Sequence, residues 1–295
     1  MKIMVTGTAG RVGRAIHIKL MQQHEVVGVD RTPCSTAQYV GDIRDQSMMQ
    51  QALAGVDVII HTAALHAPHV GLVPDAEFDS INVQATEQLA QMGLAMGVKH
   101  FIFTSTTALY GHASTPDGIA GWVDESVLPQ PKTIYHRSKI QAEQLLEALA
   151  LAHQWPVTVL QMSRCFPEPA DLMAVYRLHR GVDARDVASA HTAAVHVRPP
   201  GFKRCIVSGA SPFTPSMCQG LWDDAPTVLA AVAPDLVQAF AQRGWSLPAS
   251  LDRVYDSSQA QAVLHWQPQH GFHSVLDMLD AEVAEVLPVK SSAMG

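Results

Sequence analysis

The N-terminal apolar run leads directly into the glycine-rich segment TGTAGRVG and then into an amphipathic stretch. Its three glycines are spaced three apart, and each has a steric role: Gly7 permits a tight turn, Gly10 removes a side chain where phosphate approaches the backbone, and Gly13 lets the helix pack close to the strand. The N–H groups that follow, at Arg11 and Val12, carry the partial positive charge of a helix N-terminus. The segment therefore predicts a pyrophosphate site; the alternative is a glycine-rich turn without a ligand.

Short apolar runs alternate with helix-like stretches over the first two-thirds of the chain. We expect strands at Lys2–Thr6, Glu25–Asp30, Val56–His61, His100–Ser105 and Val157–Ser163, and helices at Gly13–Gln23, Gln46–Ala54, Phe78–Met96 and Tyr135–His153. This alternation predicts an α/β protein with a Rossmann-type, doubly wound parallel sheet.

The pattern changes after Arg164. Residues 165–181 are expected to be short and irregular because they contain two prolines, whereas 186–197 and 205–208 are expected to form another helix and strand. The predicted organisation is a dinucleotide-binding domain over 1–164 and a mainly substrate-binding lobe over 165–295, with 186–208 returning to the first domain. The last residues, Ser291–Gly295, are expected to be a frayed tail.

An acidic residue ends the second expected strand. Asp30 lies 17 residues after Gly13, where a carboxylate accepts hydrogen bonds from the ribose hydroxyls and repels a 2′-phosphate, so NAD is favoured over NADP. The neighbouring Arg31 leaves NADP open. Asp42 and Ile43 are positioned to reach the adenine; an N-cap role for Asp42 is the alternative, and the two are compatible.

Composition narrows the class of protein. The chain has 295 residues, 47% of them hydrophobic and 16% charged, which supports a large core and excludes disorder. A net charge of −7 without a basic block argues against nucleic-acid binding, and no apolar run reaches the length of a membrane span. Met1–Val5 leads into a strand, leaving no room for a signal peptide, and the four cysteines form no CxxC pair. We therefore expect a cytoplasmic protein without a structural metal.

Tyr135 and Lys139 stand four residues apart, on one face of the last expected helix and one turn apart. A phenol with a pKa near 10 is a poor base at neutral pH, and a neighbouring ammonium favours the phenolate. The pair therefore suits redox chemistry at a carbinol carbon; a solvated helix face is the alternative. The helical pattern itself places Lys139, Gln141, Glu143 and Glu147 on the solvent side.

At this point the sequence resembles the extended short-chain dehydrogenases/reductases, the family of NAD-dependent epimerases and dehydratases. The matching elements are Thr6–Gly13, Asp30, Asp42-Ile43, His61–Ala64, Asn82, Phe103–Gly111, Tyr135 with Lys139, Arg164, Asp186–Ala188 and the C-terminal stretch Asp252–Pro268. The resemblance covers nearly the whole chain and is densest before Arg164.

The resemblance implies roles for individual residues. Tyr135 would be the general acid or base, Lys139 its electrostatic partner and a ribose ligand, and Thr106 the hydroxyl that holds the substrate oxygen, with Ser105 as a neighbouring candidate. Cofactor contacts are implied for three small residues and one amide: Ala63 and Ala64 beneath the cofactor, Thr104 at the strand end, and Asn82, which would also steady the catalytic helix.

The segment after Arg164 suggests the substrate. Only 21 residues separate Arg164 from Asp186, where nucleotide-sugar enzymes carry several dozen, so we expect a smaller substrate. Ser163–Pro169 is similar to uronate dehydrogenases, in which a nearby arginine grips the substrate carboxylate; Arg177 is the first match and Arg180 the second. Solvent-facing arginines are the alternative. His66 is expected to line the substrate pocket rather than to bind a metal.

The expected function is NAD-dependent oxidation or reduction of a secondary hydroxyl on a sugar or sugar acid. Two alternatives stay open: a nucleotide-sugar epimerase or dehydratase, and a regulator that senses NAD(P) without turnover. The family often dimerises through two helices, so Phe78–Met96 and Tyr135–His153 are expected to form a homodimer interface.

Overall fold

The computed structural model describes residues 1–289, so the expected tail at Ser291–Gly295 lies outside it. One sheet of parallel strands forms its centre, in the order β3-β2-β1-β4-β5-β7-β8. Its strands are β1 (Lys2–Thr6), β2 (Glu25–Asp30), β3 (Tyr39–Val40), β4 (Val58–His61), β5 (His100–Thr106), β7 (Val157–Met162) and β8 (Phe202–Val207). The order reverses between β1 and β4, the place where ligands bind in open α/β sheets. The predicted Rossmann-type sheet is confirmed.

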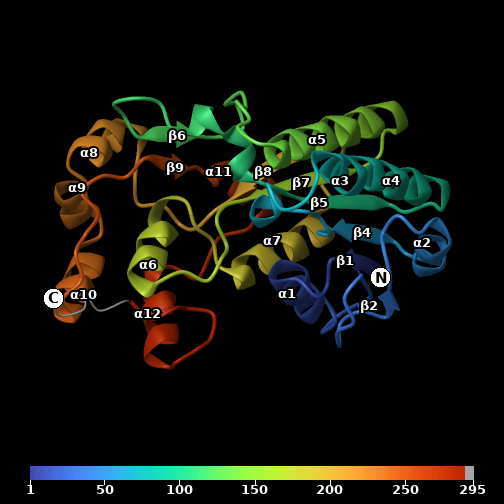
Figure 1. Ribbon diagram of the computed structural model, residues 1–295, viewed down its shortest axis with the longest axis horizontal. Helices are drawn as coiled ribbons and strands as arrows, with labels where there is room; N and C mark the ends of the chain where they lie inside the picture. The colour runs from blue at the N-terminus through green and yellow to red at the C-terminus, as the bar shows by residue number, and fades with distance from the viewer. Residues whose placement is uncertain (290–295) are drawn as a thin grey trace.

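Helices cover both faces of this sheet (Figure 1). On one side lie α2 (Gln46–Ala52), α4 (Ala85–Ala95) and α5 (Ile134–His153), and on the other α1 (Arg11–Leu20), α7 (Ala184–Val197) and α11 (Ser258–Leu264). The two faces bury separate apolar clusters, one around Met4, Ile59 and Phe101 and the other around Ile3, Val5 and Ile60. Successive β1 residues thus pack on opposite faces, as the pleat of a strand requires.

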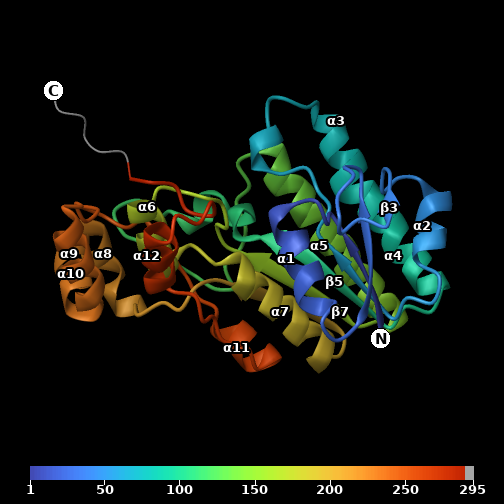
Figure 2. The same ribbon diagram turned by 90° about the horizontal axis from the view of Figure 1, so that it is seen from below.

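A second, mostly helical unit lies at one end of the molecule (Figure 2). It contains α6 (Ala170–His179), α8 (Cys218–Asp223), α9 (Ala225–Val232), α10 (Pro234–Arg243) and α12 (Phe272–Asp280), and the paired strands β6 (Gly121–Val123) and β9 (Arg253–Tyr255). These elements share an apolar core that includes Met173, Leu221 and Phe240. We call this unit the C-terminal lobe.

The chain crosses between the sheet and the lobe several times. After α6 it returns through α7 and β8, and later α11 and Trp266 also pack into the core of the sheet. The return of α11 lies outside the predicted range of 186–208. Figure 2 shows α11 beside α7, far from α8 and α9.

Two expected elements differ from the structure. Residues 165–181 are not irregular, because α6 forms a ten-residue helix with Pro169 at its N-cap and Ala170, Met173 and Ala174 buried. Proline is tolerated at a helix start, so the prolines mark where this helix begins. The single helix expected at Phe78–Met96 is divided into α3 (Asp75–Phe78), a π-helical segment η2 (Asp79–Gln84) and α4.

Short 3-10 segments connect the larger elements: η1 (Ala67–His69), η3 (Thr107–Tyr110), η4 (His112–Ser114) and η5 (Pro215–Met217).

The solvent side predicted for α5 is wrong in part, because Lys139 and Glu143 are 3% and 4% exposed. A helical pattern read from apolar residues alone assigns both to water, whereas the sheet buries them.

Among residues 1–289, no helix combines the length and the hydropathy needed to cross a lipid bilayer.

Candidate active site

The glycine-rich loop has the geometry that its spacing predicts. Gly7 has a φ of +77°, and a Cβ atom there would lie 2.6 Å from the Thr62 hydroxyl oxygen. A Cβ on Gly13 would lie 2.1 Å from the Gly7 carbonyl oxygen, so only glycine lets α1 start this close to β1. Gly10 is the N-cap of α1 and leaves the first N–H groups of the helix facing the crevice.

Asp30 lies at the C-terminal end of β2, beside this loop. Its carboxylate accepts hydrogen bonds from the Ala9 and Thr32 N–H groups, both at 2.8 Å, which fixes its orientation toward the crevice. Asp42 pairs with Arg44 through the Arg44 Nε and Nη2 atoms, and this hydrogen bonding lowers the pKa of Asp42. The N-cap of α2 is Asp45 and not Asp42.

A cavity of about 810 Å³ extends from the loop to the C-terminal lobe. We call its first part the nucleotide half; it is lined by residues expected to contact the cofactor, namely Gly7, Gly10, Arg11, Val12, Gly13, Asp30, Arg31, Asp42, Ile43, Ala63 and Ala64. The other part, the substrate half, is lined by His66, Thr106, Tyr135, Arg164, Phe166, Arg180, Arg253 and Tyr255. Thr104, Ser105 and Lys139 line the cavity where the two halves meet, and Thr106 and Tyr135 stand at this boundary on the substrate side.

Tyr135 stands in the first turn of α5, and its ring faces the end of β5. Burial raises the pKa of Tyr135 to about 12, and hydrogen bonding from Thr106 works in the opposite direction. Thr106 itself accepts a hydrogen bond from the Ala108 N–H at 3.1 Å, which fixes its side chain at the strand end. The phenol and the hydroxyl therefore lie next to each other on the cavity wall.

Lys139 is buried beneath Tyr135, one turn further along α5. Its Nζ donates a hydrogen bond to the Thr104 carbonyl oxygen at 2.7 Å and lies 3.8 Å from the centre of the Phe103 ring. Burial lowers the pKa of Lys139 to about 7, although the charge of Glu143 acts to raise it. Burial therefore makes the Lys139 ammonium easier to deprotonate than that of an exposed lysine.

Two predicted residues support the site from behind. Asn82, in η2, is 1% exposed and does not line the cavity. Its amide holds the Leu65 backbone at both N–H and C=O and donates to the Ser138 hydroxyl at 3.0 Å, so it steadies α5 instead of touching a ligand. Ser105 donates its hydroxyl to Glu143, which leaves Thr106 as the hydroxyl that faces the substrate half.

Thr104 has both of its polar groups engaged. Its hydroxyl bonds to His191 Nε2 at 2.7 Å, and its carbonyl receives Lys139. Thr104 therefore shapes the cavity wall without offering a free polar group to a ligand, and its carbonyl oxygen holds the Lys139 ammonium.

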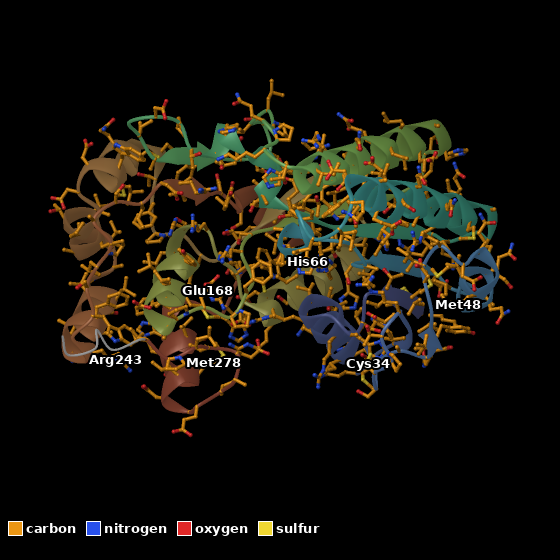
Figure 3. All side chains as sticks on the ribbon, viewed as in Figure 1. Cys34, Met48, His66, Glu168, Arg243 and Met278 are labelled. Carbon is orange, nitrogen blue, oxygen red and sulfur yellow. The ribbon has the colours of Figure 1, made fainter. Side chains whose placement is uncertain are left out.

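The histidines near the cavity have different environments. His61 is fully buried between the Thr6 and Thr86 hydroxyls, and burial lowers its pKa to about 3. His66 lines the substrate half and stacks on Phe166 with ring centres 6.1 Å apart. Figure 3 places His66 near the middle of the molecule, with Glu168 on the neighbouring segment. Within residues 1–289, no three His, Cys, Asp or Glu side chains gather as metal ligands would.

The arginine prediction needs a correction. Arg177 points away from the cavity: it is 2% exposed and pairs with Asp183 at 3.1 Å inside the protein. Its position on α6 turns it toward the start of α7, so it stabilises the junction between these helices. The second choice, Arg180, lines the cavity, as does Arg164, which pairs with Glu168.

Arg253 and Tyr255 line the cavity but were given no role from the sequence. They stand two residues apart in β9, so both side chains point to the same side of the strand. The Arg253 guanidinium bonds to Asp252 and to the Ser114 hydroxyl. This i, i+2 spacing of a cation and a phenol is the signal that would have found them.

Comparison with known proteins decides the family. A model of the NAD dependent epimerase/dehydratase family matches residues 3–170, more than half of the chain. The chain belongs to this family. The match covers the phosphate loop, Asp30, Thr106, Tyr135 and Lys139, all of which line the one cavity described above.

Individual relatives match mainly the sheet-forming part. The chain is 31% identical over 148 residues to an N-acetyl-alpha-D-glucosaminyl-diphospho-ditrans,octacis-undecaprenol 4-epimerase of Escherichia coli O157:H7, covering 49% of this chain and 42% of that protein. It is 29% identical over 164 residues to an NAD-dependent glucose-6-phosphate dehydrogenase of Haloferax volcanii, covering 48% and 60%. The matches thus span about half the length of these relatives.

A solved structure extends the likeness in fold to the C-terminal lobe. A short-chain dehydrogenase/reductase superfamily protein of Agrobacterium tumefaciens with bound NAD superposes with a TM-score of 0.73, covering 95% of this chain and 96% of that one at 18% identity. The predicted family and fold are confirmed by these comparisons.

The residues present fit NAD, the cofactor of this family. Gly7 and Gly13 bring α1 against β1, and the Asp30 carboxylate is held at the strand end where ribose hydroxyls bind. Arg11 adds an independent observation, because its Nε and Nη1 atoms are buried without a hydrogen-bond partner among the described residues. Orphaned donors beside a phosphate loop indicate a site built for an anion.

Proposed function

We propose that this protein is an NAD-dependent oxidoreductase that acts on a secondary hydroxyl of a sugar or sugar acid. One observation carries the proposal: the Tyr135 phenol, the Thr106 hydroxyl and the buried Lys139 ammonium converge where the two halves of the cavity meet.

The chain's own residues handle the proton and the alignment. Thr106 and Tyr135 bind the carbinol oxygen, and Tyr135 as phenolate accepts the hydroxyl proton while the carbon–oxygen bond becomes a carbonyl. Lys139 stabilises the phenolate by its positive charge. When bound, NAD supplies the acceptor for the hydride that leaves the same carbon. The reverse sequence of steps reduces a carbonyl.

Charge in the substrate half favours an acidic or phosphorylated sugar. Three guanidinium groups, on Arg164, Arg180 and Arg253, face two carboxylates, those of Glu168 and Asp252. Among the described residues, the Nε atoms of Arg180 and Arg253 are buried without hydrogen-bond partners. Arginine binds carboxylates and phosphates in a bidentate manner, so a substrate anion balances the one guanidinium charge that these two carboxylates leave over.

Asp30 favours NAD over NADP. A 2′-phosphate would lie beside a carboxylate that two backbone N–H groups already hold in place. Arg31, exposed at the rim, gives NADP a weaker alternative partner.

The direct test mixes the purified protein with NAD and a panel of neutral sugars, sugar acids and sugar phosphates. Growth of absorbance at 340 nm with one class, and preference for its anionic members, supports a dehydrogenase. No binding or turnover of any of these compounds, together with failure to bind NAD, contradicts the proposal.

A nucleotide-sugar 4-epimerase or dehydratase is the second candidate, because the family includes epimerases and dehydratases and one relative is named as the 4-epimerase of a sugar linked through a diphosphate. Product formation without net growth at 340 nm favours it. The short segment between Arg164 and Asp186 favours the smaller substrate.

We also propose a homodimer through α4 and α5. Met96, at the end of α4, is 41% exposed and Leu151, near the end of α5, is 71% exposed. Light scattering on the purified protein tests this; a monomer at micromolar concentration contradicts it.

A further inference from the structure

Glu143 lies on α5, the helix that carries Tyr135, and its carboxylate is buried in the protein. It lies one turn beyond Lys139 and is 4% exposed. Its oxygens accept hydrogen bonds from the Ser105 hydroxyl, from the Gln161 amide at 3.0 Å and from the Arg204 Nε at 2.7 Å. Side chains from the neighbouring strands β5, β7 and β8 thus converge on one acid. A buried carboxylate is rare unless it is paired in this way.

Lys139 needs a source of negative potential to remain an ammonium. Burial disfavours its charge, and its contacts are a carbonyl oxygen of Thr104 and the face of the Phe103 ring. Each of these contributes a partial charge only. Glu143, on the same face of α5, supplies a full one.

We propose that Glu143 is a positioning residue that keeps Lys139 protonated beneath Tyr135, and that Arg204 sets how much of the Glu143 charge reaches Lys139. This proposal rests on the proposed function only for its effect on turnover. Its effect on Lys139 is a property of the chain by itself.

The other titratable groups facing Lys139 are uncharged at neutral pH. His61 approaches from β4, and burial lowers its pKa to about 3. His191 of α7 reaches the same region through Thr104, and burial lowers its pKa to about 4. Tyr135 is held as a neutral phenol by burial, which raises its pKa to about 12.

Around Glu143 the charged neighbours are Arg204 on β8 and Glu147 on the next turn of α5. Arg204 pairs with both, at 2.7 and 3.5 Å. Tyr110 of η3 is kept protonated because burial, followed by the charge of Glu125, raises its pKa. Arg204 is therefore the group that partly cancels Glu143.

The charge matters because two forms of the catalytic pair hold the same number of protons. Tyrosinate with ammonium and tyrosine with amine interconvert at constant proton count, so pH alone does not select between them. A negative charge near Lys139 favours the ammonium and with it the reactive tyrosinate.

The first experiment titrates the Cε resonance of Lys139 in protein labelled with ¹³C at lysine Cε, assigned by its loss in Lys139→Met. We expect the midpoint to move about one pH unit lower in Glu143→Gln, because a nearby opposite charge is removed. We expect it to move higher in Arg204→Gln, and to stay close to the wild-type value in Glu143→Asp, which keeps the charge. Opposite directions from two variants of one network separate electrostatics from disruption. Unchanged midpoints, or movement in the same direction, overturn the proposal.

The second experiment measures kcat/KM against pH once a substrate is known. At pH values well below the midpoint of the acid limb, we expect Glu143→Gln to have the same kcat/KM as the wild type. The pH at the midpoint of the limb moves lower in this variant, and kcat/KM on the plateau above it falls by the factor that corresponds to this shift. A merely structural role lowers the rate equally at all pH values and leaves the limb in place, which contradicts the proposal. Because the resonance titration needs no substrate, failure of the proposed function leaves it unaffected. If Glu143→Gln does not fold, the Lys139 midpoint in Arg204→Gln tests the proposal alone: a higher midpoint supports it, and an unchanged or lower one overturns it.

Discussion

In the nucleotide half of the cavity, one continuous glycine-rich loop supplies glycines and backbone N–H groups, and the ends of the neighbouring strands add short side chains such as Asp30 and Ala63. In the substrate half, the lining groups are long side chains from separate segments, including α6's C-terminal end and β9. Loop backbone is fixed by steric contacts within a few residues, such as the 2.1 Å that a Gly13 Cβ would leave to the Gly7 oxygen. Arg180 and Arg253 are held by ion pairs with Asp252, which lies 72 residues from Arg180 along the chain. The family model covers the whole phosphate loop, whereas Arg180 and Arg253 lie beyond the residues that it matches.

The largest expected effect lies where the halves meet. Tyr135→Phe removes the proposed acid–base group and is expected to lower kcat by about 10²–10⁴-fold. NAD affinity, measured by calorimetry, should change little. Tyr39→Phe, on the partly exposed β3, is the matched control and should retain activity. Unchanged activity in Tyr135→Phe would falsify the assigned chemistry.

Gly13→Ala tests the rigidity of the nucleotide half. The added Cβ forces the loop and α1 apart, which is expected to destabilise the protein by about 1–3 kcal/mol and to weaken NAD binding. Gly271→Ala is the control, because a Cβ there meets nothing within 4 Å. Denaturant unfolding and NAD titration give both quantities. Equal behaviour of the two variants would mean that the close loop packing is not required.

Arg180→Gln tests the substrate half. It removes a cation with an orphaned Nε and is expected to raise KM for an anionic sugar by about 10–100-fold, with NAD affinity unchanged. Arg243→Gln removes a surface arginine that pairs with Asp280 and serves as the control. A selective loss of NAD affinity in Arg180→Gln would show that Arg180 serves the nucleotide half and contradict its assignment to the substrate half.

The smallest effect near neutral pH concerns the buried histidines with strongly lowered pKa values, which are His61, His100, His179 and His191. Burial lowers their pKa values to about 3 or about 4, so all of them stay neutral in the folded protein while the unfolded chain takes up protons below about 6.5. The folded pKa values lie below the unfolded ones. The free energy of unfolding is therefore highest above about pH 6.5 and falls by about 1.4 kcal/mol per histidine per pH unit below it.

Denaturant midpoints at pH 7, 6 and 5 measure this slope. A flat profile over that range would show that these imidazoles are accessible to protons in the folded state.

Much of the site followed from short-range rules. A strand, a glycine spacing and a carboxylate after the second strand led to the nucleotide half, because each depends on residues close together in sequence. The Tyr135–Lys139 pair was likewise visible, since helical spacing places the two on one face. The prediction that Arg177 binds the substrate was wrong for a different reason. Nothing in the local sequence tells an arginine facing a ligand from one that pairs with Asp183 inside the protein.

The Glu143 network shows the same division. The sequence placed Glu143 in water because helical periodicity counts apolar neighbours only, whereas Ser105, Gln161 and Arg204 come from three strands that the sheet brings together. By itself the sequence determined the sheet, the phosphate loop and the catalytic pair, because covalent proximity and steric limits act within one turn or one strand. Only the tertiary structure decided which charges are buried and which arginines face the cavity. The free energy of a charge depends on partners that are distant along the chain.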